Sequence, residues 1–387
     1  MELILVAVFA LLALAIGLYA VAVPQGGQRW WGLAAVIVFF VIASRLMSHS
    51  HASAILLDLA ELSAVALVWL HGTPDADDAA RKYLYSIVAG IACTVVAGFL
   101  IGNGAEPPGP ALQKAVVCLL ILGFTLKLGM IPFYFWLPAV AVATPPMTTA
   151  LIVSIVDIAA FGELAALREA SPWVFGEWAP AWMTIALLSM IGGALLALSQ
   201  TELKRMLAFS TITDLGLLLV GVTIGGASGI EGAWLGALNH ALSKVILFGA
   251  VGLAEHQTGQ VVTLDTRGLA ARLPFAGATF IIASLAFIGV PPGIGFAAYW
   301  RIYAAATQFG GLALILPLFL VAALDLLCYA RAIHRSWLGP ADDSVGNVQA
   351  YLAPGVLACL AVIVVVLGCI PSSLTAGGAR ELLAIAQ

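Results

Sequence analysis

Residues 127–162, KLGMIPFYFWLPAVAVATPPMTTALIVSIVDIAAFG, combine long apolar runs with one lysine, several prolines and one aspartate. A run of about 20 apolar residues is long enough for a helix to cross a bilayer. Proline removes a backbone donor and interrupts a helix, so Pro132 and Pro138 predict a broken membrane helix directly after Lys127. An ionised group at mid-bilayer costs at least about 2.5 kcal/mol on insertion scales. Lys127 and Asp157 therefore predict a polar interior and not a lipid-facing surface.

The same composition extends over the whole chain of 387 residues, of which 62% are hydrophobic and 9% are charged. An average soluble domain carries about 25% charged residues, so this chain cannot cover a water-soluble surface. We predict an all-α polytopic membrane protein with about twelve spans. These lie at residues 3–23, 31–47, 54–70, 83–103, 112–134, 147–168, 180–199, 205–225, 231–254, 274–307 with a break, 310–334 and 350–370. The first span has no basic segment before it and no convincing cleavage site, so we expect it in the mature protein.

The distribution of lysine and arginine between the loops predicts the orientation of the chain. Of the 16 such residues, nine follow odd-numbered spans, namely Arg29, Arg81, Lys82, Lys204, Arg205, Arg267, Arg272, Arg331 and Arg335. Four lie on the other side, namely Arg45, Lys114, Arg168 and Arg380. Because cytoplasmic loops are enriched in Lys and Arg, we expect both termini outside, in the inner membrane of a bacterium. The other three cations, Lys127, Lys244 and Arg301, fall inside the spans.

Several classes of site are missing from the sequence. Its five cysteines form no Cys-x-x-Cys pair and no Cys/His cluster, which argues against iron-sulfur, zinc and c-type haem sites. There is also no Gly-rich phosphate loop and no basic nucleic-acid patch. We therefore expect no cofactor, no metal, no nucleic-acid partner and no catalytic redox site in this chain.

Two proline-broken spans suggest internal symmetry. The break after Lys127 has a counterpart at Pro291 and Pro292, shortly before Arg301. These are the fifth and tenth spans, which run in opposite directions, as in transporters built from inverted repeats with broken helices. We predict an N-terminal helix at 1–30, a first repeat at 31–168, a second repeat at 169–335, and a C-terminal helix with a tail at 336–387.

Eight ionisable residues inside the predicted spans are the candidate proton path: Glu61, Lys127, Asp157, Asp214, His240, Lys244, Arg301 and Asp325. Such residues usually face the bundle interior and pair with one another. Other interpretations stay open for two of them. Glu61 and Asp58, one turn apart, could be a solvated pair near a helix end, and Lys127 could cap carbonyls freed by the break. Asp157 lies in an otherwise apolar run and needs a cation or a proton.

Asn239, His240 and Lys244 lie on one face of a predicted helix, because His240 and Lys244 are four residues apart. A lone buried histidine is more often a satisfied core residue than a proton relay. A lysine one turn away favours the relay, since histidine titrates near neutral pH. Asp214 and Asp325 are candidate partners of these cations.

Several segments together resemble the antiporter-like membrane subunits of complex I, a family shared with Mrp-type cation/proton antiporters and membrane-bound group 4 hydrogenases. Besides residues 127–162, they are LDLAELSAVALVWL (57–70), AARKYLYSIVAG (79–90), ALSQTELKRMLAFSTITDLGLLLVGV (197–222), ALNHALSKVILFG (237–249) and RGLAARLPFAGATFIIASLAFIGVPPGIGF (267–296). The resemblance implies two inverted five-helix repeats in a fourteen-helix fold, of which this chain would lack about two N-terminal helices.

The resemblance also implies roles for individual residues. Glu61 matches the family's glutamate in the first repeat, and Lys127 matches the lysine of the broken helix. His240 matches a histidine of the second repeat, and Lys244 stands where some members carry a lysine.

Other positions depart from the family pattern. Asp157 stands where the family has a bridging lysine, and Asp214 where many members have a histidine. Tyr299 replaces the terminal lysine or glutamate of the second broken helix, and Arg301 is the nearest charge. Arginine keeps its charge, so we expect Arg301 to act on a titratable neighbour, in the first place Asp325, with His240 or Lys244 as alternatives.

The leading hypothesis is a proton-translocating subunit of a larger complex, either like NADH:quinone oxidoreductase or like a membrane-bound hydrogenase. Its partners would be other membrane subunits, redox subunits elsewhere, the lipid bilayer, and protons or sodium ions. One alternative is a sodium/proton antiporter or the membrane subunit of an inorganic-carbon uptake system. Another is a non-pumping scaffold, in which Asp157 forms a fixed salt bridge with Lys127 or Lys244.

Overall fold

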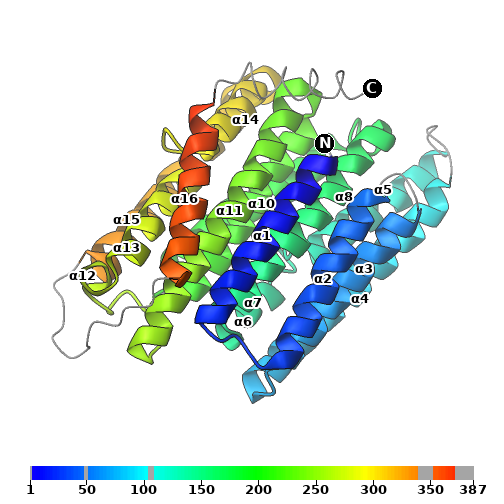
Figure 1. Cartoon of the computed structure of the whole chain (residues 1–387). Helices are drawn as coiled ribbons and strands as arrows, with labels where there is room; N and C mark the ends of the chain where they lie inside the picture. Colours follow the sequence, from blue (N-terminus) through cyan, green and yellow to red (C-terminus); the bar gives the residue numbers. More distant parts are fainter. Residues whose placement is uncertain (1, 48–50, 103–108, 339–351, 371–387) are drawn as a thin grey trace, which may run out of the picture.

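The chain folds into one bundle of long helices in a computed structural model that describes residues 2–47, 51–102, 109–338 and 352–370 (Figure 1). The α-helices are α1 (Glu2–Ala22), α2 (Gln28–Leu46), α3 (His51–Trp69), α4 (Pro74–Ile101), α5 (Pro110–Lys127), α6 (Trp136–Ala143), α7 (Pro146–Leu151), α8 (Asp157–Ala170), α9 (Ala179–Ser199), α10 (Leu203–Ile224), α11 (Gly226–Thr258), α12 (Leu269–Arg272), α13 (Pro274–Ile288), α14 (Ile294–Gly310), α15 (Leu312–Ala332) and α16 (Leu352–Cys369). Two π-helical segments, η1 (Ile152–Val156) and η3 (Ile333–Trp337), and one 3₁₀ turn, η2 (Pro172–Val174), complete the described helices.

The predicted all-α membrane fold is confirmed. Within the described residues, eleven helices are long and apolar enough to cross a membrane. The sequence predicted twelve spans, and the one that is not among the eleven is the span at 274–307. It consists of two shorter helices, α13 with 15 residues and α14 with 17. The predicted span at 147–168 is a single continuous rod made of α7, η1 and α8.

Both predicted helix breaks exist, although one proline was assigned wrongly. Helix α5 ends at Lys127 and α6 begins at Trp136, with Pro132 between them. Gly129 in this break has a φ of +59°, a conformation that residues with a Cβ rarely adopt. Pro138 is not part of the break: it lies in the first turn of α6, where its missing N–H disrupts nothing.

The second break separates α13 from α14 and contains both of its predicted prolines. Gly289 caps α13 with a φ of +89°, and Pro291 and Pro292 follow before α14 starts at Ile294. One helix break thus follows Lys127, and the other precedes Arg301. The repeat boundaries derived from these two breaks stay a prediction.

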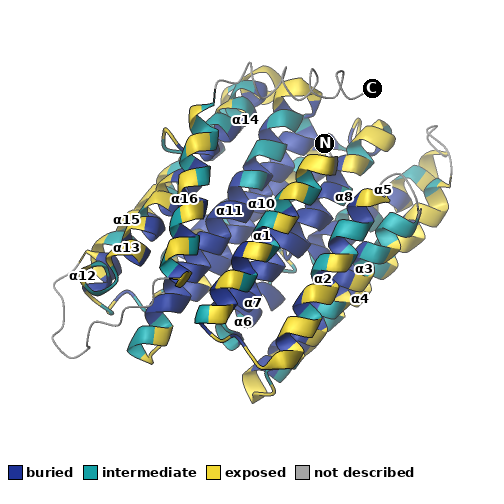
Figure 2. Ribbon diagram, in the orientation of Figure 1, coloured by how far each residue is buried: buried dark blue, intermediate teal, exposed yellow. Residues whose placement is uncertain are grey.

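The centre of the bundle is formed by α10, α11 and the rod of α7, η1 and α8. Figure 2 shows these helices buried behind α1, α2 and α16, whose outward surfaces are exposed. Of the residues in their most apolar stretches, 94% are buried in α10 and in α11, against 17% in α4. A charged residue on a buried face of α8, α10 or α11 must therefore find its partners inside the protein.

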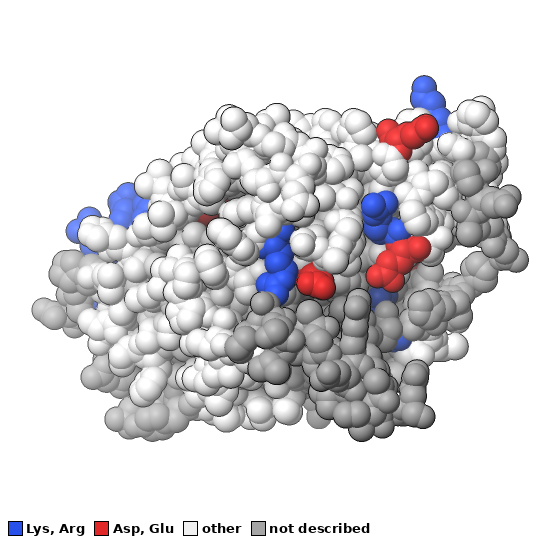
Figure 3. Space-filling model, turned by 90° about the horizontal axis from the view of Figure 1, so that it is seen from above, with Lys and Arg blue, Asp and Glu red and all other residues white. Residues whose placement is uncertain are grey.

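The first described helix starts, and the last one ends, at the same end of the bundle (Figure 1). This agrees with an even number of crossings, but the side of the membrane that this end faces stays a prediction. Seen from this end, charged side chains are scattered over a mostly uncharged surface (Figure 3). Arg380, which entered the loop count, lies outside the described residues, as does all of 371–387.

Candidate functional site

Three carboxylates surround the ammonium group of Lys127. Its Nζ lies 2.9 Å from Asp58 Oδ1, 3.2 Å from Glu61 Oε1 and 3.3 Å from Glu163 Oε2. The side chain of Lys127 is fully buried and that of Glu61 is 1% exposed, whereas those of Asp58 and Glu163 are 13% and 23% exposed. One cation thus connects an inner acid with two acids nearer the protein surface.

Close helix packing places Lys127 in this position. A Cβ added to Gly90 of α4 would lie 2.7 Å from Cγ of Lys127 and 3.1 Å from the carbonyl oxygen of Gly123. Glycine at position 90 therefore lets α4 and α5 approach each other closely. On the other side of the break, Trp136 Nε1 donates a hydrogen bond to the carbonyl of Leu126 at 3.2 Å, which joins α6 to the end of α5.

Both alternative interpretations of this region are wrong. Glu61 and Asp58 are not a solvated pair, because Glu61 is buried and both contact Lys127. The polar contacts found for Lys127 are carboxylates and not freed carbonyls. Glu163 is not among the eight predicted path residues, although it lies in the predicted span 147–168. Asp157 was predicted as a path residue because it is a charged residue within a predicted span, and the same criterion applies to Glu163.

Asp157 begins α8 and is 2% exposed. It forms no ion pair with any residue of the described parts of the chain, so the fixed salt bridge to Lys127 or Lys244 that the scaffold hypothesis requires is not present. Its Oδ2 atom has no hydrogen-bond partner in the described structure. Glu61 lies close enough for the two carboxyl groups to interact electrostatically.

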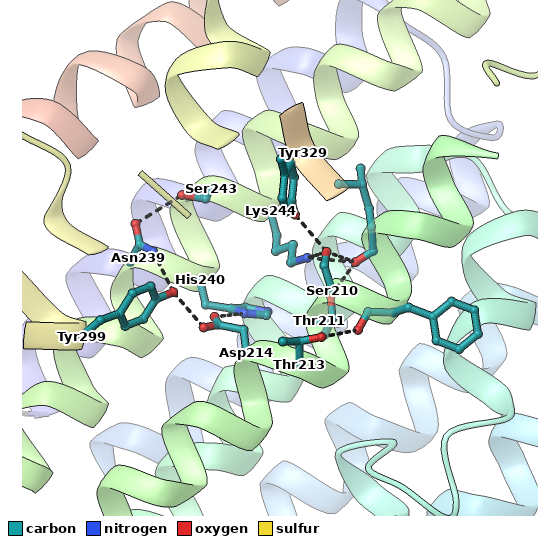
Figure 4. A network of polar contacts seen from close by, with 12 residues as sticks. Ser210, Thr211, Thr213, Asp214, Asn239, His240, Ser243, Lys244, Tyr299 and Tyr329 are labelled. Carbon is teal, nitrogen blue, oxygen red and sulfur yellow. Dashed lines mark hydrogen bonds and ion pairs between the residues drawn. The ribbon is translucent and has the colours of Figure 1, made fainter. Parts of the chain in front are cut away.

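A second polar cluster surrounds Asp214 on α10. Asp214 Oδ2 lies 2.7 Å from Nδ1 of His240, and the hydroxyl of Tyr299 donates to Asp214 Oδ1 at 2.8 Å. Asn239 Nδ2 donates in turn to the Tyr299 oxygen at 3.3 Å. Figure 4 shows Asp214 between the histidine and the tyrosine, with α10, α11 and α14 each contributing to the cluster.

Lys244 lies one turn from His240 on α11 but has different partners. Its Nζ donates to Ser210 Oγ at 2.6 Å and to the carbonyl of Leu207 at 2.8 Å. It also lies 4.2 Å from the ring centre of Phe287, a cation–π contact. Ser210 in turn contacts the hydroxyl of Tyr329 at 2.9 Å (Figure 4). Lys244 is therefore a buried amine in contact with neutral groups.

Asp325 on α15 faces the second cluster through a small cavity. The cavity is about 10 Å³, roughly enough for one water molecule, and its lining includes Asp214, Tyr299, Tyr303 and Asp325. Asp325 forms no ion pair within the described structure, and its Oδ1 atom has no hydrogen-bond partner there. Asp325 interacts electrostatically with Lys244, as expected, but without an ion-pair contact, and it also lies across this cavity from Asp214.

Arg301 does not act on Asp325 by contact. Its Nε lies 3.6 Å from Glu231 Oε2, and its Nη1 donates to the carbonyl of Ala297 at 2.7 Å. The side chain of Glu231 is 44% exposed. Arg301 therefore faces the start of α11 near the protein surface, although it lies only two residues after Tyr299.

The rod of α7, η1 and α8 connects the two clusters. Asp157, at the start of α8, interacts with Glu61 of the first cluster. One turn earlier, the backbone of Val153 in η1 faces His240 of the second cluster. Ser154, also in η1, is fully buried, and its hydroxyl has no partner in the described structure. Seven of the eight predicted path residues thus lie in or next to one polar series through the bundle, and Arg301 lies apart.

The described residues contain no group of three or more His, Cys, Asp or Glu side chains that could hold a metal ion. Around Lys127, three carboxylates do converge, but the ammonium group occupies the place that a metal cation would take. The arrangement is suited to proton binding and release by carboxyl, amine and imidazole groups.

Comparison with solved structures shows the same fold in membrane complexes. The chain aligns with a chain of the Mrp complex from Dietzia sp. DQ12-45-1b with a TM-score of 0.85 and 19% identity, covering 99% of this chain and 81% of that one. It aligns with a chain of respiratory complex I from Thermus thermophilus with a TM-score of 0.76 and 23% identity, covering 96% and 85%.

Sequence comparison identifies the family. The chain is 30% identical over 341 residues to NADH-quinone oxidoreductase subunit N of Methylovorus glucosotrophus, covering 82% of this chain and 69% of the relative. It is 30% identical over 272 residues to the subunit N of Mycobacterium bovis, of which it covers 51%, so it spans about half the length of several curated relatives. A profile described as NADH:quinone oxidoreductase/Mrp antiporter, TM, matches residues 107–324. The chain belongs to this family of membrane proteins.

Proposed function

We propose that the chain is a proton-translocating, antiporter-like membrane subunit of a larger redox-driven complex. The observation that carries the proposal is the series of buried ionisable groups that begins at Lys127, passes Asp157 and reaches the pair of His240 and Asp214. Such residues are costly inside a membrane and mark ion pathways there. The series lies beside the two helix breaks, where broken-helix transporters bind their ions.

The first cluster has more acids than bases. Three carboxyl groups contact the one ammonium of Lys127, so the cluster reaches electrical neutrality only when it binds additional protons. Asp58 and Glu163, the partly exposed acids, are suited to exchange protons with water. Glu61, the buried acid, is suited to pass them inward, through Lys127 and Asp157, to His240.

Protons are favoured over sodium as the transported ion. Na⁺ needs several oxygen ligands around an open position, and in the first cluster Lys127 occupies the space among the carboxylates. The likeness to a chain of an Mrp complex keeps cation/proton antiport as the second candidate. Transport measured with and without sodium separates the two.

The energy for transport would come from partner chains. The matched relatives are named as subunits of NADH-quinone oxidoreductase, which supports redox subunits elsewhere and further membrane subunits beside this chain. The same proposal places the chain in a bacterial inner membrane with both termini outside. It also divides the chain into two inverted repeats at 31–168 and 169–335. Mass spectrometry of the polypeptides that copurify with the chain separates a quinone reductase from a hydrogenase or a carbon-uptake system.

The deciding experiment replaces Lys127 by methionine in the assembled complex and measures proton uptake into vesicles with a pH-sensitive dye. We expect Lys127→Met to abolish transport while leaving assembly largely intact. Lys114→Met is the matched control, because Lys114 is an exposed lysine on the same helix, and it should pump normally. Normal pumping by Lys127→Met, or lost assembly with full pumping in the remainder, would support the scaffold hypothesis instead.

A further inference from the structure

The ring of Phe287 is one of three neutral groups that contact the amine of Lys244. Nζ of Lys244 donates hydrogen bonds to Ser210 Oγ at 2.6 Å and to the carbonyl of Leu207 at 2.8 Å. The third contact is the Phe287 ring, whose centre lies 4.2 Å from Nζ. An aromatic face within about 6 Å attracts a cation, and the attraction is strongest when both groups are shielded from water. Lys244 is fully buried and Phe287 is 2% exposed, so water does not weaken this contact.

Phe287 also contacts the second cluster. The centre of its ring lies 6.0 Å from that of the His240 ring, and Phe287 lines the cavity that Asp214 and Asp325 share. Among the described residues, no side-chain hydrogen bond or ion pair joins the partners of Lys244 to the cluster around Asp214 (Figure 4). Phe287 is thus a neighbour that the amine and the acid–histidine pair have in common.

The second helix break fixes the position of this ring. Phe287 lies in the last turn of α13, directly before the break. The N–H of Val290 donates to the carbonyl of Leu285 at 2.9 Å, which closes the chain around residue 287. A Cβ added to Gly289 would lie 2.6 Å from Cδ2 of Tyr299, so the break also packs against the second cluster. The break therefore contacts Lys244 through Phe287 and the second cluster through Gly289.

We propose that Phe287 is a positioning residue that holds the protonated amine of Lys244 against its ring and so couples the protonation of Lys244 to the second helix break. The attraction acts on an ammonium group and not on a neutral amine, because it arises between a positive charge and the negative face of the ring. Loss of the proton from Lys244 therefore releases the ring, and with it the end of α13. A movement of the break, conversely, changes how strongly Lys244 holds its proton. The inference rests on the proposed transport function.

The test changes the charge distribution of the ring and leaves its shape nearly constant. In the assembled complex, Phe287 is replaced by phenylalanine analogues with one, two or three ring fluorines, which withdraw electron density from the ring face stepwise. We expect proton transport into vesicles to fall in that order, by about tenfold with three fluorines, equivalent to about 1.4 kcal/mol. Phe287→Leu, which has no aromatic face, should lose at least as much.

Phe280 provides the matched control. It is fully buried on the same helix, and its ring stacks on that of Trp337 with 4.7 Å between the ring centres. The same fluorinated series at Phe280 should transport normally. Equal transport by all members of the Phe287 series, or an equal decline in the Phe280 series, would overturn the role of Phe287.

The thermal midpoint of the assembled complex tests the contact independently of transport. Fluorination at position 287 should lower the midpoint stepwise when Lys244 is present, and should leave it unchanged in Lys244→Met, which removes the charge. A stepwise decrease in both backgrounds would contradict the contact with Lys244. If Lys127→Met is inactive and the Phe287 series transports normally, this inference alone is wrong. Normal transport in Lys127→Met overturns the transport function itself.

Discussion

Asp214 Oδ2 lies 2.7 Å from Nδ1 of His240, although the two residues are 26 positions apart and sit on different helices. The same carboxylate accepts a hydrogen bond from Tyr299. Asp214 therefore determines the orientation of the imidazole and ties α10 to both α11 and α14. Lys244, the neighbour that the sequence suggested for His240, contacts Ser210 instead.

Replacing Asp214 tests whether this contact matters for transport. Asp214→Asn keeps the size of the side chain but removes the charge opposite His240, so we expect at least a tenfold loss of transport, or about 1.4 kcal/mol. Tyr299→Phe removes one neutral hydrogen bond to the same carboxylate and should cost less. The measurement is transport per assembled complex. Equal losses in the two variants would show that the charge of Asp214 contributes no more to transport than its hydrogen bond from Tyr299.

Gly90→Ala should disturb the first cluster through packing alone. The added methyl group meets Lys127 Cγ at 2.7 Å, and overpacking of this kind costs about 1–3 kcal/mol. We expect a lower thermal midpoint and reduced transport. Gly98→Ala is the control on the same helix, because a Cβ there meets no atom within 4 Å; equal behaviour of the two variants would contradict the close packing.

Glu163 should contribute to transport, although it is not among the residues predicted from the sequence. Glu163→Gln removes one of two outer acids, and Asp58 remains beside Lys127. We therefore expect slower transport, but a smaller loss than in Glu61→Gln, which removes the inner acid. Glu169→Gln, an exposed position on the same helix, should be silent. A Glu163→Gln variant that pumps like the wild type would remove this residue from the proton path.

Arg301 should be nearly dispensable, whereas Asp325 should not. Arg301 pairs with a half-exposed glutamate, and surface ion pairs contribute about 0–1 kcal/mol. We expect Arg301→Ala to fold and transport almost normally. Asp325→Asn removes a buried carboxyl that shares a cavity with Asp214, and it should impair transport. The opposite result in the same vesicle assay would return the terminal role to Arg301.

Topology is testable with reporters that are active only outside the cytoplasm. The nine-to-four distribution of loop cations predicts that the turn at Gly72, before α4, is cytoplasmic and that Gly109, before α5, is outside. Fusions after Gly72 and Gly109 should be inactive and active, respectively. The reverse pattern would invert the orientation of the whole chain.

The sequence by itself determined the membrane fold, both helix breaks and most of the buried charges. Each of these follows from local chemistry: apolar runs of sufficient length, prolines without a backbone donor, and ionised groups in apolar surroundings. Lys127, Asp157 and His240 stand out for that reason without any knowledge of their neighbours.

Only the tertiary structure decided which groups meet. Lys127 of α5 contacts Asp58 of α3 and Glu163 of α8, which are 69 and 36 residues away in the chain. Arg301 points to Glu231 and not to Asp325. Partnerships of this kind depend on the rotation and spacing of helices packed side by side. These are set by contacts between distant segments, which the pattern within one segment does not contain.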